Sequence, residues 1–278
     1  MTRGLELLET LDLHGPLTVT EIARITSHDK SWVSRIVTAC EPDGWIVREH
    51  GRVALGPRAA LLAYGSAAGE QIRRAQPLVE ALAGVTGLTA QAYGLAGRHA
   101  TVLAAAGSGS QLSSVGVGMS TSLVATAAGQ AILGQLDPAE VERLLPREPF
   151  PDPLAELLAN PGYVAFASGR FASLKAVADA PPSVPRDRRE LWARVDAVRA
   201  QGFALDEGDL HPRIGCVAVP WGDAGDGPAA LTCMGSPAEI TSSAPLSRVV
   251  LEAAAAPAAT REDVVAAAAA ARHYSVAP

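Results

Sequence analysis

The sequence predicts an α+β protein in which a small helical unit with a β-hairpin precedes a larger mixed α/β part. Three observations predict this class. Short helical patterns crowd into residues 5–40, and two strand-like runs separated by a glycine follow at 45–55. Beyond residue 84, strand-like runs alternate with helical ones. The length of 278 residues is enough for two such domains.

The composition excludes several classes of protein. Hydrophobic residues make up 48% of the chain and charged residues 19%, which predicts a packed core and excludes global disorder. A formal net charge of −6 is not that of a general nucleic-acid coat. The three cysteines do not suggest a disulfide framework, and residues 1–15 lack the pattern of a signal peptide. No uninterrupted apolar run reaches the roughly 18 residues of a membrane helix. We therefore expect a reduced, cytoplasmic protein with no membrane partner.

Two helices are expected before residue 27. Leu5, Leu8 and Leu11 recur at helical spacing, and the Gly-Pro pair at 15–16 ends that first helix. The run TVTE at 18–21 fits the S/T-x-x-E capping box, which places the start of a short second helix directly after it.

The stretch HDKSWVSRIVTAC, residues 28–40, predicts a third helix. Asp29 can cap its N-terminus, and Pro42 ends it. Gly51 allows the tight turn of a small β-hairpin over 45–55. The apolar residues of the third helix fall on one face, which predicts a buried side made of Val33, Ile36, Val37 and Cys40.

The opposite face of the third helix is polar and basic. Most such faces are only solvated, so the neighbouring elements decide the interpretation. A capped helix precedes it by a tight turn, and a hairpin with two arginines follows, which is the order of a winged helix-turn-helix. In that motif the second helix enters the major groove; Arg35 can bind guanine or a phosphate, and Lys30 lies where helix N–H groups favour a phosphate. We expect DNA contacts from Thr20, Lys30, Ser31, Trp32, Ser34, Arg35, Thr38, Arg48 and Arg52.

The remainder of the chain predicts a mixed α/β domain. A helical pattern at 57–84 has a break near 65–69. Residues 146–185 are rich in Pro and Ala and predict no defined element. Strand-like runs occur at 89–95, 99–106, 214–220 and 228–234, and helical patterns at 123–136, 138–145, 186–201 and 244–270.

Three segments resemble the IclR family of bacterial transcription regulators. The run TVTEIARITSHDKSWVSRIVTACEPDGWIVREHGRVALGPR, at 18–58, is similar to that family's DNA-binding domain. The runs GMSTSLVATAAGQAIL, at 118–133, and GFALDEGDLHPRIGCVAVPWGDAGDGPAALTCMG, at 202–235, resemble its effector domain. The resemblance implies a winged helix-turn-helix at 1–58, a linker helix at 59–70, and an effector-binding and oligomerisation domain at 71–278. It also implies a GAF/PAS-like antiparallel sheet of about six strands in the last of these. Residues 146–185 are longer than is usual in the family.

The same resemblance implies a small-molecule effector, often a carboxylate or aromatic acid. Met234 favours a larger or more apolar ligand. Only Arg98 and Arg213 lie near the matching segments, which favours a mono-acid or a neutral aromatic. Two positions depart from the family: Trp32 replaces a small residue, and Gln130 stands where a Lys is usual. The implied effector-binding residues are Ala127, Ala128, Asp206, Cys216, Thr232 and Met234, with the first two at the start of a helix whose N–H groups suit a carboxylate.

The implied partners are double-stranded operator DNA, a small-molecule effector and further copies of the chain. One short recognition helix reads too few base pairs, so we expect a homodimer or a tetramer built as a dimer of dimers. The expected pairing surfaces of the DNA-binding domain are 1–20 and 57–70.

Other chemistries have weaker support. Asp206, His211 and Cys216 are close enough in sequence for a Cys-dependent enzyme, and a protein-interaction adaptor is also open. Zinc could use His211, Cys216 and Cys233, but no paired C-x-x-C accompanies them. Cys216 could equally be a small core residue, Asp206 a turn cap, and Cys233 could face the other side of the sheet. We expect no enzymatic activity, no cofactor and no metal.

Overall fold

The computed structural model describes residues 2–64, 66–107, 116–145, 150, 183–222 and 227–274. The chain divides into two compact units, Met1–Glu70 and Gln71–Pro278, and each is considered by itself. Most of the segment 146–185 lies outside the described residues. Among the helices that are described, none is both long and apolar enough to cross a membrane.

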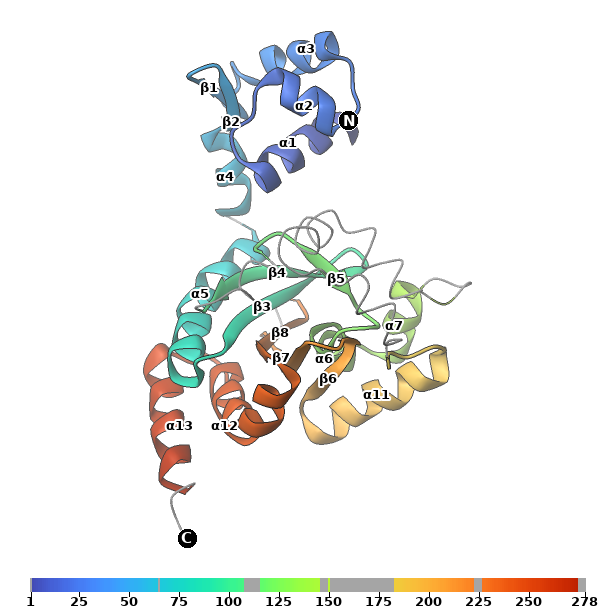
Figure 1. The fold of residues 1–278 in the computed structure, drawn as a ribbon, viewed down its shortest axis with the longest axis vertical. Coiled ribbons are helices and arrows are strands. Elements are labelled where there is room, and N and C mark those ends of the chain that lie inside the picture. The colour runs from blue at the N-terminus through green and yellow to red at the C-terminus, as the bar shows by residue number, and fades with distance from the viewer. Residues whose placement is uncertain are drawn as a thin grey trace. The chain divides into compact units, whose positions relative to one another are not determined.

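The first unit is a winged helix-turn-helix, as the sequence predicts. Three helices are followed by a two-stranded antiparallel hairpin and a further short helix (Figure 1). The elements are α1 (Thr2–His14), α2 (Val19–Ile25), α3 (Lys30–Cys40), β1 (Ile46–Glu49), β2 (Arg52–Leu55) and α4 (Pro57–Tyr64).

Local residue chemistry explains where these elements begin and turn. Thr18 and Glu21 form the capping box of α2: the Glu21 N–H donates to the Thr18 hydroxyl (3.2 Å), and the Thr18 N–H donates to the Glu21 carboxylate (2.7 Å). The hairpin turn needs two residues with positive φ, and His50 (φ 50°) and Gly51 (φ 77°) supply them. Val33 of α3 is fully buried in a small core with residues of α1, α2 and both strands.

The second unit contains a six-stranded antiparallel sheet in the order β5-β4-β3-β8-β7-β6. This agrees with the sheet that the resemblance implies. Its strands are β3 (Thr89–Ala96), β4 (His99–Ala106), β5 (Ser120–Ser122), β6 (Ala204–His211), β7 (Ile214–Trp221) and β8 (Ala229–Gly235).

Helices cover both faces of this sheet (Figure 1). One face packs against α5 (Ala67–Thr86), α12 (Pro237–Ala255) and α13 (Arg261–Tyr274). The other face, called here the α6 face, packs against α6 (Ala127–Gly134), α7 (Pro138–Leu144) and α11 (Arg188–Gln201).

The sequence patterns differ from the structure in two places. Strands β5 and β6 were not predicted, because β5 has three residues and β6 is an acidic edge strand without clean alternation. The prediction of a single helix over 244–270 was wrong. Two helices lie there, because Pro257 has no N–H for a continuing helix and Thr260 starts a new one by capping the Asp263 N–H (3.3 Å).

Candidate DNA-binding and effector-binding sites

Helix α3 presents a polar face opposite its buried one. Thr20 of α2 and Lys30, Ser31, Arg35 and Thr38 of α3 are exposed, whereas Ser34 is half-buried. On α3, positions 31 and 35 are four residues apart, and so are positions 30, 34 and 38. These residues therefore form one continuous stripe, which can approach a groove of DNA as a unit.

The N-terminus of α3 is already capped by the protein itself. The Asp29 carboxylate accepts hydrogen bonds from the N–H groups of Ser31 (2.7 Å) and Trp32 (3.2 Å). Hydrogen bonds from the Ser31 hydroxyl, and to a smaller extent from these N–H groups, hold the pKa of Asp29 below its usual value. A phosphate at this end would thus meet the Lys30 side chain rather than free backbone donors.

The structure places the Trp32 ring beside the core of its unit. Trp32 is half-buried and packs against the core cluster, and the His28 ring meets it edge-on with centroids 4.5 Å apart. His28 also lies 3.0 Å from the Glu6 carboxylate of α1. Trp32 therefore packs against the core of its unit and against His28, which in turn contacts Glu6 of α1.

Both wing arginines have acidic partners within the unit. Arg48 donates to the Glu41 carboxylate (3.0 Å) and to the Thr38 hydroxyl (3.3 Å). Arg52 lies 3.4 Å from the Glu21 carboxylate. Because exposed ion pairs of this kind contribute only about 0–1 kcal/mol, a phosphate can exchange for the carboxylate at small cost.

Strand register brings the sequence-predicted effector residues together. Asp206 pairs with Cys216, and Cys216 pairs with Met234, so one row of side chains crosses β6, β7 and β8. Cys216 packs against the cluster that includes α6, which places this row on the α6 face. Thr232 lies two residues from Met234 and shares that face.

Three further polar residues on this face were missed from the sequence. Thr89, Gln91 and Tyr93 alternate along β3 and are all buried. The Tyr93 hydroxyl donates to the Gln91 side-chain oxygen (2.7 Å), and the Thr232 hydroxyl donates to the Gln91 carbonyl (3.2 Å). The alternation TAQAY at 89–93 was the available signal, since a polar residue at every second position marks one face of a strand.

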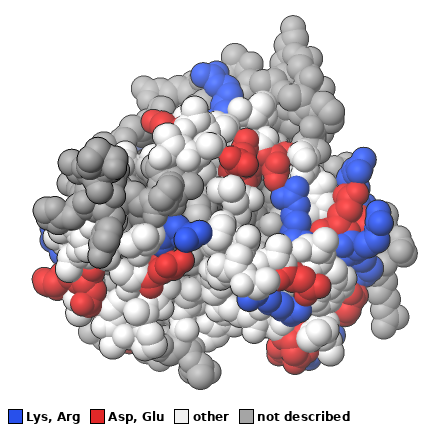
Figure 2. Space-filling view, turned by 90° about the horizontal axis from the view of Figure 1, so that it is seen from below, with Lys and Arg blue, Asp and Glu red and all other residues white. Residues whose placement is uncertain are grey.

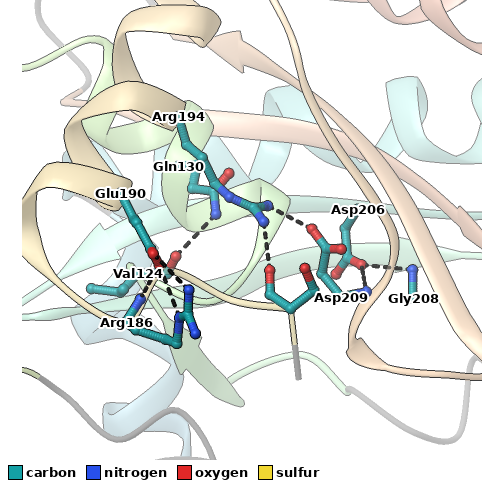
Figure 3. Close-up of polar contacts among 9 residues, drawn as sticks. Val124, Gln130, Arg186, Glu190, Arg194, Asp206, Gly208 and Asp209 are labelled. Atoms are coloured by element: carbon teal, nitrogen blue, oxygen red, sulfur yellow. Dashed lines mark hydrogen bonds and ion pairs between the residues drawn. The ribbon is translucent and has the colours of Figure 1, made fainter. Parts of the chain in front are cut away.

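Asp206 is the buried carboxyl group of this cluster (Figure 3). Its side chain is turned inward, and the residue is only 7% exposed. One carboxylate oxygen, Oδ1, accepts from the N–H groups of Gly208 (2.9 Å) and Asp209 (2.7 Å). Burial raises the pKa of Asp206 to about 6, and these two N–H groups only partly offset the rise.

The residues at the start of α6 are part of the core. Thr126 caps the helix by accepting from the Gly129 N–H (3.1 Å), and the methyl groups of Ala127 and Ala128 are buried. Any contact of these two alanines with a ligand would therefore use their backbone N–H groups. Gln130 is buried one turn further along and donates to the Val124 carbonyl (3.0 Å), as Figure 3 shows.

The geometry does not favour the alternative chemistries at Cys216. Burial raises the pKa of the Cys216 thiol well above its usual value, which disfavours the nucleophilic thiolate. Cys233 faces the opposite side of the sheet, in the other core cluster, so the two thiols do not converge on one metal. Across the described residues, no group of three metal-ligating side chains is present.

Charged side chains on and beside helix α11 of the second unit form ion pairs. Ion pairs such as Arg186–Glu190 (2.9 Å) and Arg199–Asp196 (3.2 Å) lie on its helix α11 or beside it. Figure 2 likewise shows basic and acidic side chains next to one another on the face that it draws. The face drawn there is not the basic stripe of a nucleic-acid interface.

Comparisons with known proteins agree with this architecture. Residues 5–53 match the MarR family. The HTH-type transcriptional regulator BhcR of Paracoccus denitrificans is 26% identical over 263 residues, which covers 91% of this chain and 84% of that protein. The crystal structure of IclR from Thermotoga maritima shares the fold with a TM-score of 0.60 at 20% identity, covering 95% of this chain and 96% of that one. An IclR homolog from Microbacterium hydrocarbonoxydans, solved with 4-hydroxybenzoate, has a TM-score of 0.65 at 20% identity, covering 98% of both chains.

The fold of this chain matches these solved structures over nearly its whole length. A winged helix-turn-helix followed by a helix and an α/β domain with a six-stranded sheet is the architecture that it shares with the solved IclR structures. The curated relative BhcR, with which the chain can be aligned over both units, is an HTH-type transcriptional regulator.

Proposed function

We propose that this protein controls transcription by reading a palindromic operator with α3 and the hairpin, and that a small-molecule effector on the α6 face changes its affinity for DNA. The observation that carries this proposal is the exposed stripe of Lys30, Ser31, Arg35 and Thr38 on a helix whose other face is buried. The proposed roles follow the division into 1–58, 59–70 and 71–278. Effector binding then acts by shifting the population of DNA-competent states.

The effector class has independent support. The Microbacterium homolog is complexed with 4-hydroxybenzoate, a small aromatic acid. In this chain, the α6 face of the sheet carries Asp206, Cys216, Thr232 and Met234. We propose a small organic or aromatic acid as effector, bound in the cytoplasm where the operator is also found.

Exposed leucines support self-association. Leu5 of α1 is 53% exposed, and Leu61 and Leu62 of α4 are 67% and 64% exposed. Large apolar side chains of this kind mark contact surfaces when they cluster. A dimer formed through them would present two recognition helices to the two halves of a palindrome, and two dimers could pair into a tetramer.

The test is fluorescence anisotropy with DNA from upstream of the protein's own gene and a scrambled duplex, at two salt concentrations. If neither duplex is preferred, the operator is first selected from random duplexes by the wild-type protein. Arg35→Ala should weaken specific binding by about 10- to 100-fold, because one good base contact contributes about 1–3 kcal/mol. Arg143→Ala, which removes an exposed arginine of the second unit, is the matched control and should bind as wild type does.

Two results would contradict the proposal. Unchanged operator affinity in a folded Arg35→Ala variant would remove α3 from the recognition surface. Failure of the wild type to bind any duplex, even at low salt and with candidate acids present, would favour the protein-interaction adaptor instead.

A further inference from the structure

Asp206 has an unusual position for a carboxylate. Both of its hydrogen bonds use the same oxygen, Oδ1, and within the described part of the chain no donor reaches the other oxygen, Oδ2. The residue is only 7% exposed, so bulk water does not compensate. Buried carboxylates are normally paired with a cation or fully hydrogen-bonded, because an unpaired charge is costly in a low-dielectric site.

The arginine that attracts Asp206, Arg194, already forms hydrogen bonds with two other groups. Arg194 of α11 donates to the Asp209 carboxylate (2.5 Å), as Figure 3 shows. It also donates to the Ser183 carbonyl (2.5 Å). Among the described side chains, no Lys or Arg forms an ion pair with Asp206. The charged groups that influence Asp206 are thus Asp209 on its own strand, which repels it, and Arg194, which attracts it only weakly.

The neighbours along the row are of a different character. Cys216, the register partner of Asp206, is close enough that the negative charge of Asp206 raises the pKa of its thiol, and Met234 follows on the next strand. These sulfur-containing side chains are polarisable and apolar, and they adapt to irregular shapes. A molecule on this row would therefore meet two sulfur-containing side chains and, at the β6 end, one unpaired carboxylate oxygen.

We propose that Asp206 selects effectors by the group they present to it: a hydrogen-bond donor, either a hydroxyl or an ammonium, binds Oδ2, and a carboxylate at that position is rejected. This inference rests on the effector site proposed above and names the chemistry of one end of its ligand. An acidic group of the same ligand then points away from Asp206. Like charges at hydrogen-bond distance in a buried site repel strongly, whereas a donor restores the missing hydrogen bond.

The test uses four para-substituted benzoates that differ in one group: benzoate, 4-hydroxybenzoate, 4-(aminomethyl)benzoate and terephthalate. Their dissociation constants are measured by isothermal titration calorimetry on the full chain at pH 7.5. The wild type should bind at least one donor-bearing probe about tenfold or more tightly than benzoate, since a hydrogen bond to a charged group has about that effect. Terephthalate should bind more weakly than benzoate.

Two variants test whether the preference for a hydrogen-bond donor depends on Asp206. Asp206→Asn keeps the shape and an acceptor for the two N–H groups but removes the charge, so the preference for the donor should fall to within about threefold. Asp196→Asn, at an exposed carboxylate of α11, is the matched control and should retain it. Circular dichroism checks that both variants are folded.

The pH response distinguishes the two kinds of donor. Because burial raises the pKa of Asp206 to about 6, the carboxyl is mostly protonated at pH 5. A preference for 4-(aminomethyl)benzoate should weaken there, and one for 4-hydroxybenzoate should weaken less, since a protonated carboxyl can still accept from a hydroxyl.

Each result has a defined meaning. A preference for the hydroxyl probe alone assigns a neutral donor, and one for the aminomethyl probe alone assigns a cation. Binding of benzoate or terephthalate as tight as that of both donors, a preference that survives Asp206→Asn, or no binding of any probe to the wild type would overturn the inference. Operator binding by the same preparations is measured separately, so a failure of the regulator proposal is recognised independently.

Discussion

Asp206→Asn should make the protein more stable at neutral pH. The folded state raises the pKa of this carboxyl from 3.8 to about 6 because the group is buried. A rise of that size disfavours the ionised form in the folded state by about 3 kcal/mol. An asparagine has the shape of the protonated acid and carries no charge, so up to about 3 kcal/mol should be recovered at pH 7.5.

The sign and the pH window follow from the same values. Well below pH 3.8 both the folded and the unfolded states hold the proton, and the group contributes nothing. As the pH rises from 3.8 to about 6, the unfolded chain ionises first, which lowers the free energy of unfolding. Above that range the whole penalty is present. The advantage of the asparagine variant at pH 5 should therefore be about half of that at pH 7.5.

Urea denaturation of both proteins at the two pH values measures the effect. The buried Trp221 of the second unit gives an intrinsic fluorescence signal for its unfolding. A variant that is less stable than the wild type at pH 7.5, or a difference that is the same at both pH values, would refute the reasoning. Either result would mean that Asp206 is better compensated than its hydrogen bonds indicate.

The remaining predictions concern packing and capping. Gly129→Ala should destabilise the second unit by about 2 kcal/mol or more, because the new Cβ would lie 2.5 Å from the Leu123 backbone. The matched change Gly84→Ala, in α5 with nothing within 4 Å, should stabilise the same unit by about 0.5–1 kcal/mol. Thermal unfolding compares them, and equal melting temperatures would contradict both. Thr18→Ala removes the capping partner of Glu21 and should lower the free energy of unfolding of the first unit by about 1 kcal/mol. An unchanged unfolding midpoint of that unit would contradict this prediction.

The first unit was the most predictable part of the chain, since its signals are local. The cap at Thr18, the apolar stripe through Val33 and the glycine turn at Gly51 each depend on residues within a few positions of one another. The structure has all three at the predicted positions. The assignment of individual side chains to DNA stays a prediction, because exposure alone does not identify a partner.

The polar cluster of the second unit was harder to predict for a physical reason. The Thr232 hydroxyl meets the Gln91 carbonyl across a sequence separation of 141 residues. Strand order and register bring them together, and neither is encoded by the pattern of a single strand. The resemblance supplied Asp206, Cys216, Thr232 and Met234. The alternation at 89–93 could place Gln91 and Tyr93 on one face of a strand, but only the pairing of β3 with β8 brings that face beside Thr232.

The ion pairs of the two wing arginines have a consequence for the salt dependence of DNA binding. In the absence of nucleic acid, Arg48 forms an ion pair with Glu41, and Arg52 forms one with Glu21. In the proposed complex with DNA, phosphates displace these carboxylates, and the freed carboxylates attract small cations, which offsets part of the release of cations from the DNA. The slope of log affinity against log salt should therefore be shallower than the number of contacting arginines implies. In the proposed complex with DNA, these two arginines would thus orient the hairpin on the duplex more than they would add ionic binding energy, and operator affinity should depend less on ionic strength than two unpaired arginines would make it.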